Sequence, residues 1–331
     1  MYLLVDRFGA FLGKKSERLQ IQLEGKVVEE YPFLHLEGLI IASKGISIST
    51  DLLSALMENG IMTYITSVRG EPVALISSPA LHATISTRRK QLLATSEPIS
   101  TKVSKAIVKG KLTNQAFLLK YFSKYRRGDK KIELLNIAKR IIDSLKEIEK
   151  IKNDPIEFAR DEILNIEAVA GKFYWQGVNI ILGESFKKRE HRGAKDPVNS
   201  CLNYGYGILY GRIWQAVILA GLEPFAGLLH TDRSGRPSLI LDLIEEFRQF
   251  TVDRTVISIF TKKRDIEIEK DGLLTEKSRR LIAEKVLERL DTPHSFMGKK
   301  YTMSSIIQIQ ARNLATAIRE DKGYKPFIGK W

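Results

Sequence analysis

The side chains best suited to chemistry lie within residues 227–248, in the sequence GLLHTDRSGRPSLILDLIEEFR. His230 ends an apolar run, and a polar turn follows it. The Pro-Ser pair after that turn is a typical helix start. On the predicted helix Asp242, Glu245 and Glu246 stand at i, i+3 and i+4, so they share one face. A histidine beside a carboxylate-bearing helix could bind a hard or borderline divalent cation.

The same spacing has a second interpretation. Acidic residues at i, i+3 and i+4 commonly form the solvated face of a helix. A lone histidine such as His230 is often a structural residue. Spacing alone leaves both interpretations open, and a further carboxylate elsewhere in the chain would favour the metal site.

Glu167 is a candidate for that further carboxylate. On the predicted helix its same-face neighbours carry no charge: Ile163, Leu164, Ala170, Gly171 and Tyr174. Such a carboxylate either points to solvent or is buried with a partner, because unpaired burial is costly. Gly171 within a helix costs about 1 kcal/mol relative to Ala, which suggests that another element approaches closely there.

Composition indicates a soluble protein. With 331 residues and 44% hydrophobic content the chain can form one or two globular domains. It has no apolar run long enough for a membrane span, and its N-terminus lacks the features of a signal peptide. The single cysteine, Cys201, excludes an internal disulfide and a cysteine-cluster metal site. A cytoplasmic location fits this cysteine usage.

The net charge of +14 is unevenly distributed. Residues 1–80 hold 7 Lys+Arg against 9 Asp+Glu, a net of −2, so the remaining residues carry +16. Residues 86–131 hold 13 Lys+Arg against 2 acids, a net of +11. This distribution predicts that the second part of the chain binds a polyanion.

Two basic runs are the candidate DNA contacts, although such runs are also common as solubilising surface. Aromatic side chains lie among the charges of 86–131, and the charge exceeds what solubility requires, which favours nucleic-acid binding. Phosphate contacts of this kind carry little sequence information. The candidates are Arg88, Arg89, Lys90, Lys124, Arg126 and Arg127.

The elements that must position these residues fall into two groups. Residues 1–80 read as short strands separated by glycines, with one helix at 51–59. Helices are expected near 84–95, 99–127, 131–151, 155–183, 198–220, 238–249, 274–291 and 303–320. Residues 254–262 fit either a helix continuation or a strand, and the tail 323–331 is expected to be loosely held.

We therefore predict an α+β fold in two domains. A small N-terminal β-domain, residues 1–80, ends near the Ser-Ser-Pro sequence at 77–79 and serves dimerisation. A larger all-α domain, residues 81–331, carries the catalytic and DNA-binding residues.

Four motifs in order give the chain a family resemblance. Glu167 in IEAVAGKFYW is followed by DPVNSCLNYGYGILYGRI, then GLLH, then LDLIEEFRQFTVDR. This series resembles the CRISPR-associated integrase family, the first of the numbered Cas proteins and the nuclease of CRISPR adaptation. The resemblance implies a small β-domain before a helical domain. It also implies homodimers that flank a dimer of a small ferredoxin-like Cas partner and insert spacer DNA into the repeat array.

The resemblance also implies the site. Glu167, His230 and Glu245 match the family's catalytic metal ligands, with Asp242 as an auxiliary carboxylate, and Mg²⁺ or Mn²⁺ as the ion. Relatives often have aspartate where Glu245 stands, so the choice between Glu245 and Asp242 stays open.

Residues near the implied site match as well: Asn199, Asn203 and Tyr206 fit the family's polar motif. The expected function is that of a metal-dependent DNA endonuclease and integrase. It acts on double-stranded and branched DNA by attack of a 3′-hydroxyl on a phosphodiester. The alternatives are a non-catalytic basic nucleic-acid-binding protein and a general metal-dependent nuclease acting on branched DNA or RNA.

Overall fold

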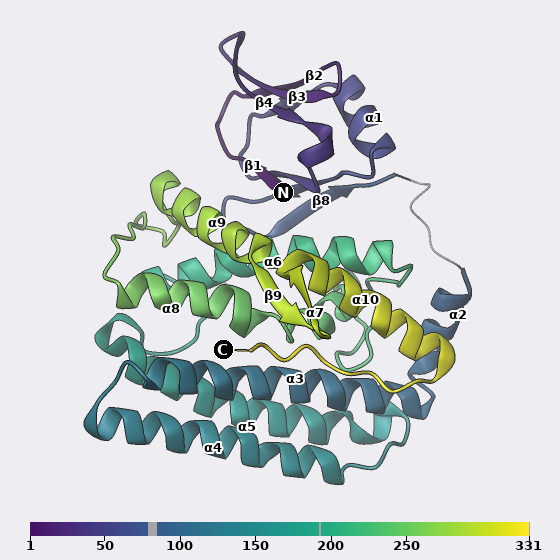
Figure 1. Cartoon of the computed structure of the whole chain (residues 1–331), viewed down its shortest axis with the longest axis vertical. Helices are drawn as coiled ribbons and strands as arrows, with labels where there is room; N and C mark the ends of the chain where they lie inside the picture. The colour runs from purple at the N-terminus through teal and green to yellow at the C-terminus, as the bar shows by residue number, and fades with distance from the viewer. Residues whose placement is uncertain (79–84, 192, 331) are drawn as a thin grey trace. The chain divides into compact units, whose positions relative to one another are not determined.

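The computed structural model describes residues 1–78, 85–191 and 193–330 (Figure 1). The chain forms two compact units, Met1–His82 and Ala83–Trp331. The domain boundary predicted between residues 80 and 81 lies outside the described residues. In the described part of the chain no helix is long and apolar enough to cross a membrane.

The first unit contains two four-stranded sheets and one α-helix. Parallel pairing joins β1 to β5 and β5 to β7, and β8 pairs antiparallel with β7. In the second sheet β3 pairs antiparallel with both β2 and β4, and β6 pairs parallel with β2. The elements are β1 (Tyr2–Val5), β2 (Phe11–Lys15), β3 (Arg18–Leu23), β4 (Lys26–Pro32), β5 (Gly38–Ile41), β6 (Ser47–Ile48), α1 (Thr50–Glu58), β7 (Met62–Thr66) and β8 (Pro72–Ile76).

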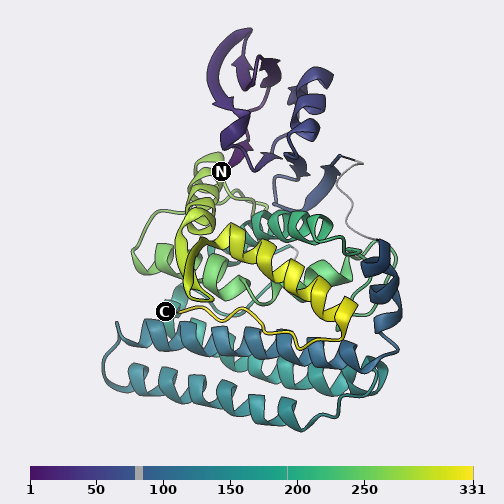
Figure 2. The ribbon, with the colours of Figure 1, turned by 45° about the vertical axis from the view of Figure 1, so that its right-hand side comes forward.

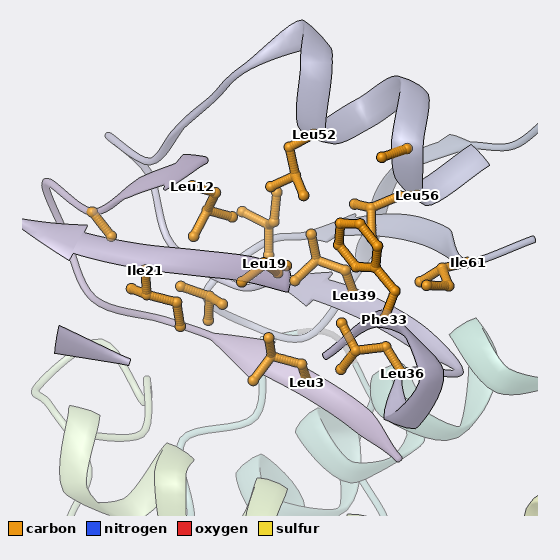
Figure 3. Close-up of a cluster of buried hydrophobic side chains, with 14 residues drawn as sticks. Leu3, Leu12, Leu19, Ile21, Phe33, Leu36, Leu39, Leu52, Leu56 and Ile61 are labelled. Carbon is orange, nitrogen blue, oxygen red and sulfur yellow. The ribbon is translucent and has the colours of Figure 1, made fainter. Parts of the chain in front are cut away.

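Leucine and isoleucine side chains from both sheets and α1 form one core in this unit (Figure 3). Leu19 and Ile21 alternate along β3 and are both buried, as the strand pattern predicted. Strands β2 and β6 were not predicted. Their sequences are short and, in β2, interrupted by Gly13, so neither has a clear apolar period.

The second unit is largely helical, which confirms the predicted α+β fold. All eight predicted helices are present, residues 254–262 form a helix rather than a strand, and a short hairpin of β9 and β10 was not foreseen. The elements are α2 (Ile85–Ala94), α3 (Pro98–Ser123), α4 (Gly128–Lys150), α5 (Ile156–Leu182), α6 (Pro197–Leu219), α7 (Ser238–Ile244), α8 (Arg254–Thr261), α9 (Glu276–Asp291), β9 (Pro293–Phe296), β10 (Lys299–Thr302) and α10 (Met303–Glu320).

Helices α3, α4 and α5 pack together, each against the other two (Figures 1 and 2). The close approach expected at Gly171 is not there, since a Cβ at that position would meet nothing within 4 Å. Gly177, two turns later on α5, makes the close contact instead. A Cβ there would lie 2.7 Å from a methyl group of Leu119 on α3, so a larger residue would force Leu119 to shift.

The expectation of a loosely held tail was wrong. The C-terminal segment, residues 322–330, runs along α3 (Figures 1 and 2), and Phe327 is only 2% exposed. Asn114 of α3 donates from Nδ2 to the Phe327 carbonyl and accepts at Oδ1 from the Gly329 amide. The residue that binds the C-terminal segment is more than 200 positions away in sequence, so the composition of the segment did not indicate this contact.

Candidate active site

The three carboxylates that follow His230 in sequence do not share one face. Helix α7 ends at Ile244, and the next amides bond three residues back: Glu245 to Asp242, and Glu246 to Leu243. With about three residues per turn, a side chain at i+4 is rotated well away from residue i. Glu246 therefore points into a different environment from Asp242 and Glu245.

Asp242 is fully buried and holds the GLLH loop. Its Oδ2 accepts from the Leu228 and Leu229 amides at 2.7 and 3.1 Å, and its Oδ1 accepts from the His230 amide at 3.0 Å. The same Oδ1 lies 2.6 Å from His230 Nδ1. Both oxygens of Asp242 are thus engaged, so the residue is placed to orient the imidazole and leave Nε2 as the ring nitrogen that could bind a metal.

Glu167 and Glu245 meet at a lysine that the sequence analysis did not identify. Lys111 Nζ on α3 lies 2.6 Å from Glu167 Oε1 and 2.7 Å from Glu245 Oε2. All three side chains are largely buried, and Arg248 Nη2 lies 3.4 Å from Glu245 Oε1. Residues 111, 167 and 245 come from three separate elements, so only the packing of α3 against α5 and the α7 region brings them together.

The charges in this pocket depend on one another. Burial alone would disfavour ionised Glu245, but Arg248 and Lys111 outweigh it and lower the pKa of Glu245 to about 2. Burial likewise opposes a charged His230, yet Asp242, Glu245 and Glu167 raise the pKa of its imidazole. Both glutamates therefore lie close enough to His230 for their charges to affect the pKa of its imidazole.

The described residues contain no group of three His, Cys, Asp or Glu side chains already spaced to hold one metal ion. The Lys111 ammonium occupies the position between the two glutamates instead. Glu245 Oε2 is buried and receives no well-aligned hydrogen bond from the described residues, so Lys111 serves it as a counter-ion. Two carboxylates and an imidazole are a donor set that Mg²⁺ or Mn²⁺ could use once the ammonium moves aside.

Tyr206, which the resemblance placed near the site, contacts two arginines. The Arg248 and Arg189 guanidinium carbons lie 4.8 and 5.4 Å from the centre of its ring. Its hydroxyl donates to Asp253, which also accepts from Tyr174 at 2.5 Å. Tyr206 therefore connects Arg189 and Arg248 to a buried carboxylate, and of these two arginines Arg248 contacts Glu245.

Asn199 and Asn203 act through Arg189. Their Oδ1 atoms accept from Arg189 Nη1 at 2.9 Å and Nη2 at 2.6 Å. Asn199 Nδ2 donates to the Lys188 carbonyl, and Asn203 Nδ2 donates to the His191 carbonyl. The two amides thus hold the loop that presents Arg189, rather than facing Glu167 and Glu245 directly.

The predicted DNA-binding cations lie at opposite ends of α3. Arg88, Arg89 and Lys90 belong to α2, before α3, and the second run follows its C-terminal end. A 26-residue helix is about 39 Å long, so the two runs form separate surfaces. Arg89, Lys90, Lys124 and Arg127 are exposed and Arg88 is half-buried. Arg126 is partly committed to the protein, since its Nη2 donates to the Ile181 carbonyl.

Part of the positive charge of residues 86–131 is paired within the protein. Lys102, Lys109 and Lys111 form ion pairs with Asp321, Glu149 and the two pocket glutamates. Lys105 donates to the Ile151 carbonyl. The net of +11 therefore overstates the charge available to DNA, because acids distant in sequence pack against the same helix.

One signal could have identified Lys111 from the sequence. On an ideal helix its i−4, i−3, i+3 and i+4 neighbours are Ile107, Val108, Asn114 and Gln115, all uncharged and all buried. A lysine on such a face needs a partner for the same reason that Glu167 does. When two buried helix faces each carry one lone charge, and the charges have opposite sign, the two residues are candidates to form an ion pair.

Comparison with known proteins agrees with the order of these motifs. The family model described as CRISPR associated protein Cas1 matches residues 3–288. A CRISPR-associated endonuclease Cas1 from Archaeoglobus fulgidus is 34% identical over 347 residues, covering all of both chains. One from Francisella tularensis subsp. novicida is 33% identical, covering 100% of this chain and 99% of that protein.

Solved structures share the fold at lower identity. A casposase bound to an integration product aligns with a TM-score of 0.82 at 23% identity, over 98% of this chain and 92% of the other. A CAS1 protein from Thermotoga maritima aligns with a TM-score of 0.79 at 18% identity over the full length of both.

Proposed function

The chain belongs to the Cas1 family, and from that membership and the geometry of the pocket we propose that it is a divalent-metal-dependent DNA endonuclease and integrase. It inserts new spacer DNA into a CRISPR repeat array. The observation that carries this proposal is the meeting of Glu167 and Glu245 at one buried cation, the Lys111 ammonium, with His230 close enough for both glutamates to raise the pKa of its imidazole.

The proposed metal ligands are Glu167, Glu245 and His230 Nε2. Of the two acidic residues that the sequence left open, we assign Glu245 rather than Asp242 as a ligand. Asp242 has its oxygens engaged by three loop amides and the His230 ring. The three proposed ligands would hold Mg²⁺ or Mn²⁺, which would supply Lewis-acid polarisation of the scissile phosphodiester and stabilisation of the leaving 3′-oxygen. Lys111 must first move away from the two glutamates, and its ammonium is then available to pair with a DNA phosphate.

The proposed reaction exchanges one phosphodiester bond for another. The 3′-hydroxyl of the incoming DNA attacks phosphorus and loses its proton, while the bond to the leaving 3′-oxygen breaks and that oxygen gains a proton. Attack by water in the same geometry gives hydrolysis instead. The fold it shares with a casposase bound to an integration product supports strand transfer as the main reaction.

A labelled branched DNA that mimics a half-integrated spacer tests the proposal. With Mg²⁺ or Mn²⁺ present, a denaturing gel is expected to show a longer, rejoined strand, and the His230→Ala variant is expected to bind DNA without producing it. Only shortened strands would indicate a general nuclease. Equal cleavage of single-stranded RNA would indicate an RNA nuclease, and binding without any metal-dependent product would indicate a non-catalytic DNA-binding protein.

DNA, a second copy of this chain and a small ferredoxin-like Cas protein are the proposed partners. Solved relatives of the same fold include a TtCas1–DNA complex and a Cas6-RT-Cas1–Cas2 complex. In this chain the exposed cations Arg89, Lys90, Lys124 and Arg127 are proposed to contact phosphates, so binding should weaken steeply with salt.

The first unit is proposed to form the homodimer. It exposes large apolar side chains, with Leu34 91% and Phe8 79% exposed, and such side chains are typical of interfaces when they gather. Sedimentation of Leu34→Glu should show weaker self-association than that of the wild type. Leu92→Glu, on α2 and 60% exposed, is the matched control. If only Leu92→Glu weakens the dimer, the interface lies on the helical unit.

A further inference from the structure

A second charged site lies apart from the glutamate pocket, where α8 packs against α9. It is a cavity of about 420 Å³. Five basic side chains and one acidic side chain line it: Arg254, Lys262, Arg264, Lys285, Arg289 and Glu288. Glu288 is engaged by Lys285 at 2.7 Å. The lining therefore carries a large excess of positive charge.

Two arginines at the base of this basic pocket are held in place by aromatic rings. The Arg289 guanidinium lies 4.2 Å from the centre of the Phe250 ring, and its Nε donates to the Phe250 carbonyl at 3.0 Å. Arg254 lies 4.4 Å from the centre of the Tyr121 ring. Stacked guanidinium groups lose little further freedom when they bind an anion, because their orientation is already fixed.

The positive charge of the basic pocket is not balanced from within. Arg289 Nη2 is buried and has no hydrogen-bond partner among the described residues. Burial and the neighbouring Arg254 lower the pKa of Arg289 to about 10, and burial with both arginines lowers the pKa of His294 to about 4. Neighbouring cations that repel each other in a partly buried site create a strong positive potential, which attracts an anion.

We propose that the basic pocket binds a phosphate group of the DNA backbone. Its volume and its paired guanidinium groups suit a phosphate oxyanion, which accepts several parallel N–H bonds. Tyr121 lies ten residues after Lys111 on α3, which is about 15 Å along the helix axis. A DNA strand spans that distance with on the order of four nucleotides.

None of the residues predicted to contact DNA lines the basic pocket. The basic pocket is therefore an additional phosphate-binding site, separate from the reacting phosphodiester. This inference rests on the proposed function, because it takes DNA as the ligand. Its separate content is that one defined phosphate is held between α8 and α9 by Arg254 and Arg289.

Salt-dependent DNA binding by the full chain tests the inference. In Arg254→Gln/Arg289→Gln the slope of log K against log salt is expected to fall by about 1, as for the loss of one phosphate contact. Lys262→Gln/Arg264→Gln removes two exposed cations of the rim without touching buried contacts, and should also lower the slope. Lys14→Gln/Lys15→Gln, exposed on β2, is the matched control and should leave it unchanged.

Thermal melting with inorganic phosphate separates a DNA phosphate from a free anion. Phosphate should raise the melting temperature of the wild type but not of Arg254→Gln/Arg289→Gln. If that difference appears while DNA slopes stay equal, the pocket is a free-anion site and the inference is wrong. If Arg254→Gln/Arg289→Gln does not fold, the rim variant decides, and an unchanged slope there overturns the inference.

His230→Ala keeps the two proposals distinguishable. It should lose strand transfer yet retain the wild-type salt slope. Wild-type protein that neither binds nor rejoins DNA would refute the proposed function. If the wild-type protein binds and rejoins DNA but the basic-pocket variants keep the wild-type salt slope, only the proposed phosphate site is refuted.

Discussion

Glu245 and Glu246 are consecutive residues with buried carboxylates, yet they belong to two different regions of the helical unit. Glu245 faces the active-site pocket, where Lys111 and Arg248 are its partners. Glu246 faces the C-terminal segment and accepts from the Tyr324 hydroxyl at 2.7 Å and the Phe327 amide at 2.6 Å. Gln310 Nε2 donates to the same carboxylate at 3.1 Å.

The partners decide what each carboxylate can do. Despite burial, the cations around Glu245 lower its pKa to about 2, so it stays ionised and can exchange one cation for another. Burial raises the pKa of Glu246 to about 7, with only neutral donors opposing the shift. The first arrangement suits a metal ligand and the second a structural clamp, because neutral donors cannot be replaced by an ion without loosening the segment.

The largest expected effect comes from Glu245→Ala. Loss of a charge that acts on the reacting phosphodiester should reduce strand transfer by about 1,000-fold. The fold should persist, since the substitution leaves the C-terminal clamp intact. Gel assays of rejoined product, with circular dichroism as the control, measure this. A variant that unfolds, or that keeps full activity, would contradict the assignment of Glu245 to the pocket.

Glu246→Ala should show the opposite pattern. Three donors lose their acceptor, so the free energy of unfolding should fall by about 3 kcal/mol. Chemical denaturation measures the loss, and Glu246→Gln is the control because its amide oxygen still accepts. If Glu246→Ala is as stable as the wild type, the C-terminal segment is not clamped by this residue.

Lys111→Met tests whether the ammonium competes with a divalent ion. Removing the competing charge-assisted contact should raise the affinity for Mn²⁺ by about tenfold, measured by electron paramagnetic resonance of free Mn²⁺ without DNA. Lys109→Met, which removes an exposed ion pair on the same helix, should leave the affinity unchanged. Weaker Mn²⁺ binding in Lys111→Met would mean that Lys111 assists the site instead of occupying it.

The smallest effect is expected from Tyr324→Phe, which removes one neutral donor from Glu246. The free energy of unfolding should fall by about 1 kcal/mol, and Mn²⁺ affinity should not change. A change in Mn²⁺ affinity would show that the active-site pocket and the C-terminal segment are coupled. Glu245 and Glu246 would then not have separate roles.

The sequence by itself determined the fold class and most elements of this protein. Apolar periodicity depends on neighbours within one or two turns, so α3, α5 and α10 are evident from the chain alone. The order of the Glu167, Asn199 and His230 motifs also identified the family.

Tertiary structure alone decided which charged groups are partners. Helix periodicity assigned Asp242, Glu245 and Glu246 to one face, but the tight turns after α7 direct them to His230, Lys111 and the C-terminal segment. The contacts of Lys111 with Glu167 and Glu245 join residues 56 and 134 positions apart and leave no local pattern. Burial, which fixes the free-energy cost of a charge, is a property of the packed chain. The same physical reason explains why the basic stretch of α3 is partly neutralised and why the C-terminal segment is fixed.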